Sequence, residues 1–409
     1  MRFHSRKLDV RCFLFFFLAF FSVWSEAKIK ENVSSFFADS EPQQVIEKIL
    51  ALADIKINGD KAWDIRVNDQ EFFTRVLKDG SLGLGESYMA GWWDCSALDE
   101  CMYRILRADL KNHLKIDWAL CWSFFKAKLF NKQDKIGSLK VIQGHYQLGN
   151  DLFENMLDGL MAYSCGYWKK ASDLDEAQKA KFDLIAQKLG FKPGMRVLDI
   201  GCGWGGFAKH VAEHYGVEVL GVTLSENQAA YAKALCEGLP VEIRIQDYRD
   251  VEGTFDRIIE IGMFEHVGKK NYRAFMELVH RCLKEDGLFM LHTIGRNTSI
   301  MTVDPWIDRY IFPNGQLPSI TQIGESIEGL FVMEDWHNFS TDYDKTLMAW
   351  FYNFDKKWDI IKPTYPDPFY RMWKYYLLSC AGAFRARTLQ LWQVVLSKKG
   401  VLGGYESIR

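Results

Sequence analysis

A short apolar stretch that runs directly into clustered glycines constrains the fold of this chain more than any other feature. Residues 197–206 read VLDIGCGWGG, and helical spacing follows at 205–215. Glycine lets a backbone turn tightly and approach a ligand closely. In sheets of parallel strands, cofactors bind at the carboxyl ends of the strands, where this loop would lie. The stretch therefore predicts a strand, a cofactor-binding loop and a helix in succession.

Strand-like and helix-like segments alternate on both sides of this loop. Strands are predicted at 195–200, 217–223, 241–245, 256–261 and 288–293, and helices at 205–215, 225–237 and 271–284. Such alternation implies parallel pairing in a doubly wound α/β sheet. Residues 300–342 break the rhythm and are expected to form an insertion over the sheet edge. Two aromatic helices at 344–360 and 368–385 and a last strand at 389–397 are expected to follow.

The first quarter of the chain predicts a small mixed domain at 43–110. Helical spacing at 45–53 and 70–77 flanks a short strand at 64–67, and the glycines of 80–93 mark turns and close packing.

Composition excludes several other classes of protein. Apolar residues make up 48% of the 409 residues, which excludes a disordered chain, and the net charge of −2 gives no overall attraction to nucleic acid. Aromatic residues reach 15%, a first indication of an apolar substrate.

Residues 103–140 carry a strong local charge. They hold nine Lys or Arg and three Asp, a net +6 against −2 for the whole chain. Helical spacing at 116–130 places Trp118, Trp122 and Phe125 on one face, with Lys126 and Lys128 among the polar residues. A basic, aromatic-rich amphipathic helix suits the surface of an anionic bilayer. A helix that faces the protein core, with its lysines in water, is an equally open interpretation.

The N-terminus and the cysteines point to different compartments. Four Arg or Lys residues lie within 1–11, a thirteen-residue apolar run follows at 12–24, and Ser-Glu-Ala stands at 25–27. This pattern is typical of a secretory signal peptide and is shorter than the ~20 residues of a transmembrane helix. The nine cysteines are odd in number and form no CxxC pair, which indicates a reducing compartment. An uncleaved anchor and a misassigned start codon are the alternatives to export.

The glycine loop by itself is also compatible with a dinucleotide. Two details argue against that ligand: the spacing is GxGxGG, and Asp199 stands two residues before Gly201. The pattern resembles the S-adenosylmethionine loop of class I methyltransferases, in which the acid and the loop amides hold the methionine end. Most members place an acidic residue after the second strand to bind the ribose. Here Thr223 and Gln228 stand in that region and are expected to bind the ribose instead.

Ten further sequence strings occur together. They are GSLGLGESYMAGWWD (80–94), HYQLGNDLF (145–153), YSCGYW (163–168), VTLSENQ (222–228), QDYRD (246–250), GMFEHVG (262–268), LHTIG (291–295), YIFPNG (310–315), DYDKTLMAW (342–350) and CAGAFRAR (380–387). Through them the chain resembles the bacterial cyclopropane-fatty-acyl-phospholipid synthases, within the cyclopropane and mycolic acid synthase family, from about residue 42 to about 398. The mycolic-acid members lack the GESYM-containing N-terminal domain.

The resemblance implies a domain plan and an activity. It implies a seven-stranded, mostly parallel class I methyltransferase sheet with a smaller mixed α+β N-terminal domain. Its expected segments are a signal-like or anchor segment at 1–27, a lipid- and membrane-binding domain at 28–125, a basic linker at 126–144 and a catalytic domain at 145–409. The implied enzyme transfers a methylene from S-adenosylmethionine to the cis double bond of an acyl chain in a membrane phospholipid. The resulting carbocation would be deprotonated by bound bicarbonate.

Residue by residue, the resemblance implies a bicarbonate cage of Cys165, Glu265, His292, Tyr343 and Ile294. A histidine and a tyrosine can donate hydrogen bonds to an oxyanion. Glu265 fits beside an anion only if it orients the histidine or shares a proton. Cys165 has the alternative of an inert buried thiol.

For two other residues near these motifs, we favour a structural role over a catalytic one. For Cys380 we favour tight helix packing over chemistry, because the reaction needs no thiol nucleophile and buried cysteine commonly packs as a small hydrophobe. For His266 we favour a core role, because lone histidines are usually satisfied core residues.

The implied cofactor residues gather at the predicted strand ends. They are Tyr163, Ser164, Asp199, Gly201, Cys202, Gly203, Trp204, Gly205, Gly206, Thr223, Ser225, Gln228, Gln246, Asp247 and Tyr248. One position departs from the family, because Gln147 stands where Asp is usual. A separate HxxEH match at His210–Glu213–His214 has no evident third ligand, so we expect no metal site.

Two rival functions and the cellular setting follow from the same residues. A related transferase would leave a methyl or methylene branch on the acyl chain, and a lipid-binding protein would catalyse nothing. Because S-adenosylmethionine is a cytosolic metabolite, we expect a cytoplasmic enzyme bound peripherally to the inner face of the membrane. We also expect an uncleaved or artefactual N-terminal segment and, from relatives, a homodimer.

Overall fold

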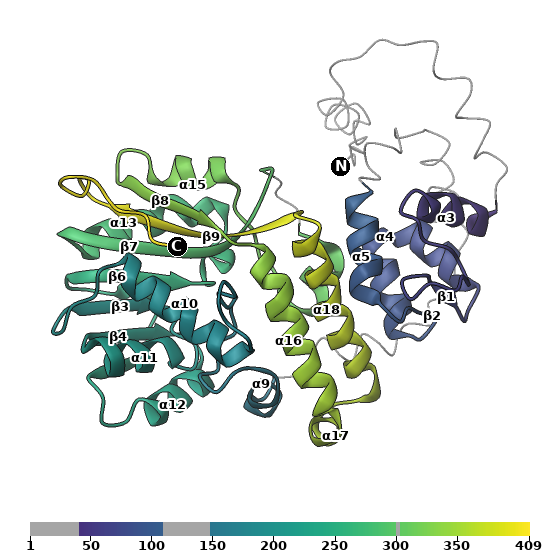
Figure 1. The fold of residues 1–409 in the computed structure, drawn as a ribbon, viewed down its shortest axis with the longest axis horizontal. Coiled ribbons are helices and arrows are strands. Elements are labelled where there is room, and N and C mark those ends of the chain that lie inside the picture. The colour runs from purple at the N-terminus through teal and green to yellow at the C-terminus, as the bar shows by residue number, and fades with distance from the viewer. Residues whose placement is uncertain (1–40, 109–147, 300–302) are drawn as a thin grey trace, which may run out of the picture.

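A seven-stranded sheet forms the centre of the larger part of the molecule. The computed structural model describes residues 41–108, 148–299 and 303–409 (Figure 1). The strands are β3 (Arg196–Ile200), β4 (Glu218–Thr223), β5 (Val241–Ile245), β6 (Phe255–Ile261), β7 (Leu283–Arg296), β8 (Val332–Asn338) and β9 (Leu389–Ser397), in the order β5-β4-β3-β6-β7-β9-β8. Only β9 runs antiparallel to its neighbours, β7 and β8. The predicted seven-stranded, mostly parallel sheet is confirmed.

Helices cover both faces of this sheet. They are α10 (Leu174–Lys188), α11 (Gly206–Tyr215), α12 (Glu226–Leu235), α13 (Tyr272–Cys282) and α15 (Ile320–Ile327). Two further helices, α9 (Asn150–Met156) and α14 (Pro305–Tyr310), pack mainly on other helices. Side chains alternate along a strand, so neighbouring residues face different helices. Val197 and Met290 pack with α10 and α11, whereas Leu198 and Phe289 pack with α13 and α15.

The segment at 300–342 differs from the prediction. Instead of a simple insertion over the sheet, it contains α14, α15 and the edge strand β8. Val332 and Met333 at the start of β8 are exposed, because the strand pairs only with β9. An edge strand need not carry a continuous apolar run, which is why the sequence pattern did not reveal it.

Two long helices join the sheet to the N-terminal part. They are α16 (Thr341–Lys356) and α18 (Asp367–Arg385), with the short α17 (Trp358–Ile361) between them. The helix predicted at 344–360 is therefore divided in two. Short 3-10 turns complete the described chain: η2 (Tyr248–Asp250), η3 (Phe264–His266), η4 (Lys269–Asn271) and η5 (Lys362–Thr364).

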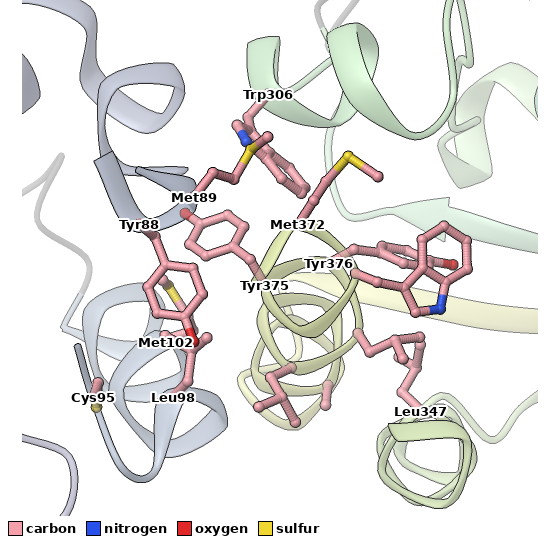
Figure 2. Packing of buried hydrophobic residues seen from close by; sticks show 14 of the residues in the cluster. Tyr88, Met89, Cys95, Leu98, Met102, Trp306, Leu347, Met372, Tyr375 and Tyr376 are labelled. Atoms are coloured by element: carbon pink, nitrogen blue, oxygen red, sulfur yellow. The ribbon is translucent and has the colours of Figure 1, made fainter. Parts of the chain in front are cut away.

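The N-terminal part is a small mixed unit packed on α18. It contains α3 (Pro42–Ala51), β1 (Arg66–Val67), α4 (Glu71–Met89), β2 (Trp93–Asp94) and α5 (Leu98–Arg107). Gly80 has a φ of 56° and kinks α4, which continues beyond its predicted end at 77. Figure 2 shows Tyr88 and Met89 facing Tyr375 on α18. One buried cluster therefore spans both parts.

Several predictions concern residues outside the described ones. These are the signal-like segment at 1–27, the amphipathic helix at 116–130, the linker at 126–144 and Gln147. Among the residues that the structure describes, none of the helices combines the length and apolar character needed to cross a membrane.

Candidate active site

A cavity of about 530 Å³ opens at the carboxyl ends of β3, β4 and β6. The glycine loop after β3 forms one wall, and Gly201 and Gly203 adopt φ values of 81° and 53°. A side chain at Gly206 would collide with the Leu160 carbonyl. These positions require glycine because of backbone conformation or close approach.

Most of the expected cofactor residues line this cavity. Those that do are Tyr163, Ser164, Asp199, Gly201, Cys202, Gly203, Trp204, Gly206, Thr223, Gln228, Gln246, Asp247 and Tyr248. Gly205 instead supports the loop from behind with a φ of 84°, close to Ala232. Ser225 caps α12, and its Oγ accepts a hydrogen bond from the Gln228 amide at 3.3 Å. The Thr223 hydroxyl donates to the Gln228 side chain at 3.0 Å.

Asp199 gives the cavity its buried carboxylate. Its Oδ2 has no hydrogen-bond partner within the described part of the chain. Burial raises the pKa of Asp199 to about 7, and the nearby Lys181 ammonium opposes that rise. A buried carboxylate oxygen with no partner, beside a glycine loop, fits the ammonium group of S-adenosylmethionine.

Sequence reasoning missed Lys181. This lysine of α10 is fully buried, and its Nζ donates to the Ser164 hydroxyl at 2.7 Å. Burial lowers its pKa to about 8, while Asp158, Cys165 and Asp199 raise it. No sequence motif distinguishes it from the exposed Lys179 of the same helix. His266 also lines the cavity, although we favoured a core role for it.

Glu265 and His292 do not line the cavity, whereas Met263 and His266, which are close to Glu265 in the chain, do. Glu265 is in η3, and its Oε1 accepts a hydrogen bond from the Ile294 amide at 2.7 Å. Burial raises the pKa of Glu265 to about 7. Burial, together with nearby positive charges, lowers the pKa of His292 well below its usual value. Glu265 Oε2 and His292 Nε2 are both buried without a hydrogen-bond partner among the residues described.

The remaining expected cage residues meet in one small cluster. Cys165 is buried with Phe339, and Ile294 and Tyr343 pack against them. Its Sγ donates to the Gly166 carbonyl at 3.2 Å, and burial raises the pKa of the thiol well above its usual value. The Cys165 thiol is therefore protonated at neutral pH, which excludes a thiolate role at that pH.

Aromatic side chains pack next to this cluster. The rings of Tyr343 and Phe384 stack at 4.5 Å, and those of Tyr163 and Trp350 lie 5.1 Å apart. The Tyr163 and Tyr376 hydroxyls are hydrogen-bonded at 2.8 Å. This wall comes from α16, α18 and the loop before α10.

Cys380 lies on α18 and packs against the large buried cluster. Burial raises the pKa of its thiol to about 12. Two residues later, a Cβ at Gly382 would lie 2.6 Å from the Asp99 carbonyl oxygen on α5. The surroundings of Cys380 are thus a close helix contact.

The HxxEH residues lie on α11. His210 Nε2 is 2.7 Å from the Asp183 carboxylate, and the rings of His210 and His214 are 4.5 Å apart. Within the described ranges, no three His, Cys, Asp or Glu side chains are grouped so that they could hold a metal ion.

Comparison with known proteins identifies the family to which the chain is similar. Residues 133–394 match the family model "Mycolic acid cyclopropane synthetase". The chain is 53% identical over 371 residues to the cyclopropane-fatty-acyl-phospholipid synthase of Escherichia coli K12, covering 91% of this chain and 97% of that protein.

Solved structures show the same architecture. A cyclopropane synthase from Mycobacterium tuberculosis is 32% identical, with a TM-score of 0.59 over 65% of this chain and 100% of that one. A mycolic acid cyclopropane synthase in complex with SAH and CTAB is 33% identical, with a TM-score of 0.58 over 63% of this chain and 97% of that one. The chain therefore belongs to the mycolic acid cyclopropane synthetase family, as an enzyme built on the class I methyltransferase fold.

Proposed function

We propose that this enzyme transfers a methylene from S-adenosylmethionine to the cis double bond of an unsaturated acyl chain in a membrane phospholipid and forms a cyclopropane ring. The observation that carries the proposal is the position of Glu265 and His292, buried with a free polar atom each, next to a cavity that holds Asp199 and the glycine loop. The likeness to the E. coli synthase over nearly its whole length supports the same conclusion.

The cavity residues would hold the methyl donor in a fixed orientation. Asp199 would accept hydrogen bonds from the ammonium group, and the loop amides would donate to the carboxylate. Thr223 and Gln228 are suited to the ribose hydroxyls, and Tyr248 to a face of the adenine. When bound, S-adenosylmethionine supplies an activated methyl group on a sulfonium. An alkene is a poor nucleophile, so its orientation against that methyl group supplies much of the rate.

The aromatic wall would protect the cation that follows. The π electrons of the alkene would form a bond to the methyl carbon while the bond from that carbon to sulfur breaks. The sulfur would keep that electron pair and leave as a neutral thioether, and the positive charge would pass to the second alkene carbon. Tyr343 stacks on Phe384 and meets Trp350 edge-on, and such apolar aromatic surroundings would exclude water and stabilise a cation. A base then removes a proton from the added methyl group, and the released electron pair closes the three-membered ring.

We infer that the base is bicarbonate held by Glu265 and His292. Glu265 has a raised pKa and His292 is neutral, so both can offer a hydrogen to an oxyanion through Oε2 and Nε2. Tyr343 and Cys165 carry further O–H and S–H donors nearby. The Ile294 amide already donates to Glu265, so it would act through that side chain.

We propose the predicted domain plan for the rest of the chain. Residues 28–125 would bind the bilayer, 126–144 would link them to the catalytic domain at 145–409, and the enzyme would act as a homodimer on the cytoplasmic face. Replacement of Lys126 and Lys128 by Glu should weaken binding to anionic vesicles, by about 1 kcal/mol per charge. Unchanged vesicle binding would show that Lys126 and Lys128 do not contribute to membrane binding.

Lipid analysis of expressing cells tests the activity directly. The enzyme and its Glu265→Gln variant are expressed in cells that lack cyclopropane lipids, and acyl chains are identified by gas chromatography–mass spectrometry. A methylene-bridged ring with the unaltered enzyme alone is expected. A methyl or methylene branch would favour the related transferase, and unchanged lipids would favour a lipid-binding protein.

A further inference from the structure

His292 lies at one end of a buried polar row that crosses three strands. In the sheet register, His292 on β7 is opposite Gln393 on β9, and Gln393 is opposite His337 on β8. Directly opposite residues point to the same face of a sheet. His292 is 1% exposed and Gln393 is 0% exposed. Gln393 Nε2 lies 3.3 Å from His292 Nδ1.

Cations close the far end of this row. Lys188 of α10 is fully buried, with its Nζ 3.1 Å from His337 Nδ1 and 3.2 Å from the Asp335 carboxylate. The Arg409 guanidinium contacts the same carboxylate at 2.6 Å. Lys181 lies on the same helix, two turns before Lys188. Burial and the charges of Lys181 and Lys188 disfavour a second proton on His292.

The orientation of the Gln393 amide decides which nitrogen of His292 carries the single proton. With Nε2, its donor end, 3.3 Å from His292 Nδ1, Gln393 has its carbonyl oxygen buried without a partner among the described residues. An amide N–H can donate only to a bare nitrogen, so His292 Nδ1 is the acceptor and Nε2 holds the hydrogen.

We propose that Gln393 is a positioning residue that fixes His292 as the neutral tautomer with its hydrogen on Nε2. His292 then offers its Nε2–H as a hydrogen-bond donor rather than acting as a base. The catalytic consequence rests on the proposed function, since the donor would hold the oxyanion that accepts the proton. The tautomer itself is a property of the protein without ligands.

Nitrogen chemical shifts of ¹⁵N-histidine-labelled protein test this assignment, because protonated and bare ring nitrogens differ widely in shift. The His292 signals are identified by their loss in His292→Ala. In the unaltered protein we expect a protonated Nε2 and a bare Nδ1. In Gln393→Met the donor to Nδ1 is lost, so a population of His292 with its hydrogen on Nδ1 should appear. Turnover should fall roughly tenfold or more while affinity for S-adenosylmethionine stays within about twofold.

Gln390→Met is the matched control. Gln390 is a buried amide on the same strand that contacts Ser340, Asn338 and Arg387. Its replacement should leave the His292 tautomer unchanged. A hydrogen on Nδ1 in the unaltered protein, or an unchanged tautomer together with unchanged turnover in Gln393→Met, would overturn the proposal. Because no lipid or methyl donor is present in this measurement, its outcome is independent of the test of the activity.

Discussion

At the scale of the single residue, burial determines the chemistry of the proposed anion site. Burial raises the pKa of Glu265 and lowers that of His292, so it favours the uncharged form of both groups. Uncharged groups that still carry a hydrogen can surround an anion without repelling it. This resolves the apparent conflict of a glutamate placed next to bicarbonate.

The first prediction concerns these two residues. Glu265→Gln and His292→Ala should each lower turnover by ~10²-fold or more, because a held proton acceptor loses its position. Affinity for S-adenosylmethionine, measured by calorimetry, should remain nearly unchanged. Glu277→Gln and His280→Ala, on the outer helix α13, are matched controls. Near-normal turnover in both site variants would remove the bicarbonate cage from the mechanism.

A second prediction concerns the buried lysine at the cofactor cavity. Lys181→Met removes the cation that lowers the pKa of Asp199 and that holds the Ser164 hydroxyl. Affinity for S-adenosylmethionine at pH 7 should therefore fall roughly tenfold, the equivalent of one pKa unit. Lys188→Met is the matched control, because Lys188 is equally buried on the same helix but contacts His337 and Asp335. Equal losses of affinity in the two variants would contradict a specific role for Lys181.

The sequence alone predicted the site residues whose chemistry depends on their spacing in the chain. The glycine loop and Asp199 adjoin each other in the chain, so a pattern could reveal them. Lys181 and Gln393 could not be found in this way, because their roles depend on contacts with Ser164 and His292 that only the folded sheet creates. A lysine or a glutamine in an amphipathic segment is normally at the surface.

At the scale of the element, α4 and α14 connect the N-terminal part to the active site. Gly85 on α4 packs against the indole of Trp306, which is buried in α14. On the same helix, Glu86 accepts a hydrogen bond from the Tyr310 hydroxyl at 2.9 Å. Two residues further, Phe312 contacts the Tyr163 ring at 6.5 Å between centroids. A shift of α14 would therefore displace the aromatic side chains around Tyr163.

This contact gives the third prediction. In Gly85→Ala the new methyl group would overlap the Trp306 indole, so α14 must move. We expect a loss of about 1–3 kcal/mol in the free energy of unfolding, typical of overpacking, together with reduced turnover. Denaturant unfolding and a lipid assay measure the two effects. Gly324→Ala on α15 has no atom within 4 Å of the new methyl group and should be neutral or stabilising. A similar loss in both variants would contradict the packing argument.

Elements were predictable where burial on both faces creates a continuous apolar run. β3 and β4 are of this kind, with all residues but the first buried. β8 was not, because its first residues are exposed at the sheet edge. The single helix expected at 344–360 is interrupted at Lys357, which has a non-helical backbone that the apolar periodicity does not record.

At the scale of the whole molecule, buried charge is concentrated between α10 and the antiparallel end of the sheet. Lys188, Asp335 and His337 are enclosed there together, and Arg409 contacts Asp335. Charged groups in such a layer are stable only while each keeps a partner. Acid that protonates one of them should therefore affect the stability of the entire fold.

His337 is the group whose titration is most informative. Burial and the Lys188 and Arg409 charges lower its pKa from 6.5 to about 3. Between these pH values the unfolded chain binds a proton at His337 and the folded protein does not. Stability is therefore lost as the pH falls from about 6.5 toward 3.

His337→Gln, which can still accept a hydrogen bond from Lys188, removes this loss. Its melting temperature should rise relative to that of the unaltered protein as the pH falls from 7 to 4. Under the same scan, His280→Gln should gain less, since His280 is less buried. A constant difference between His337→Gln and the unaltered protein at every pH would show that His337 is protonated in the folded state and that its partners do not exclude the second proton.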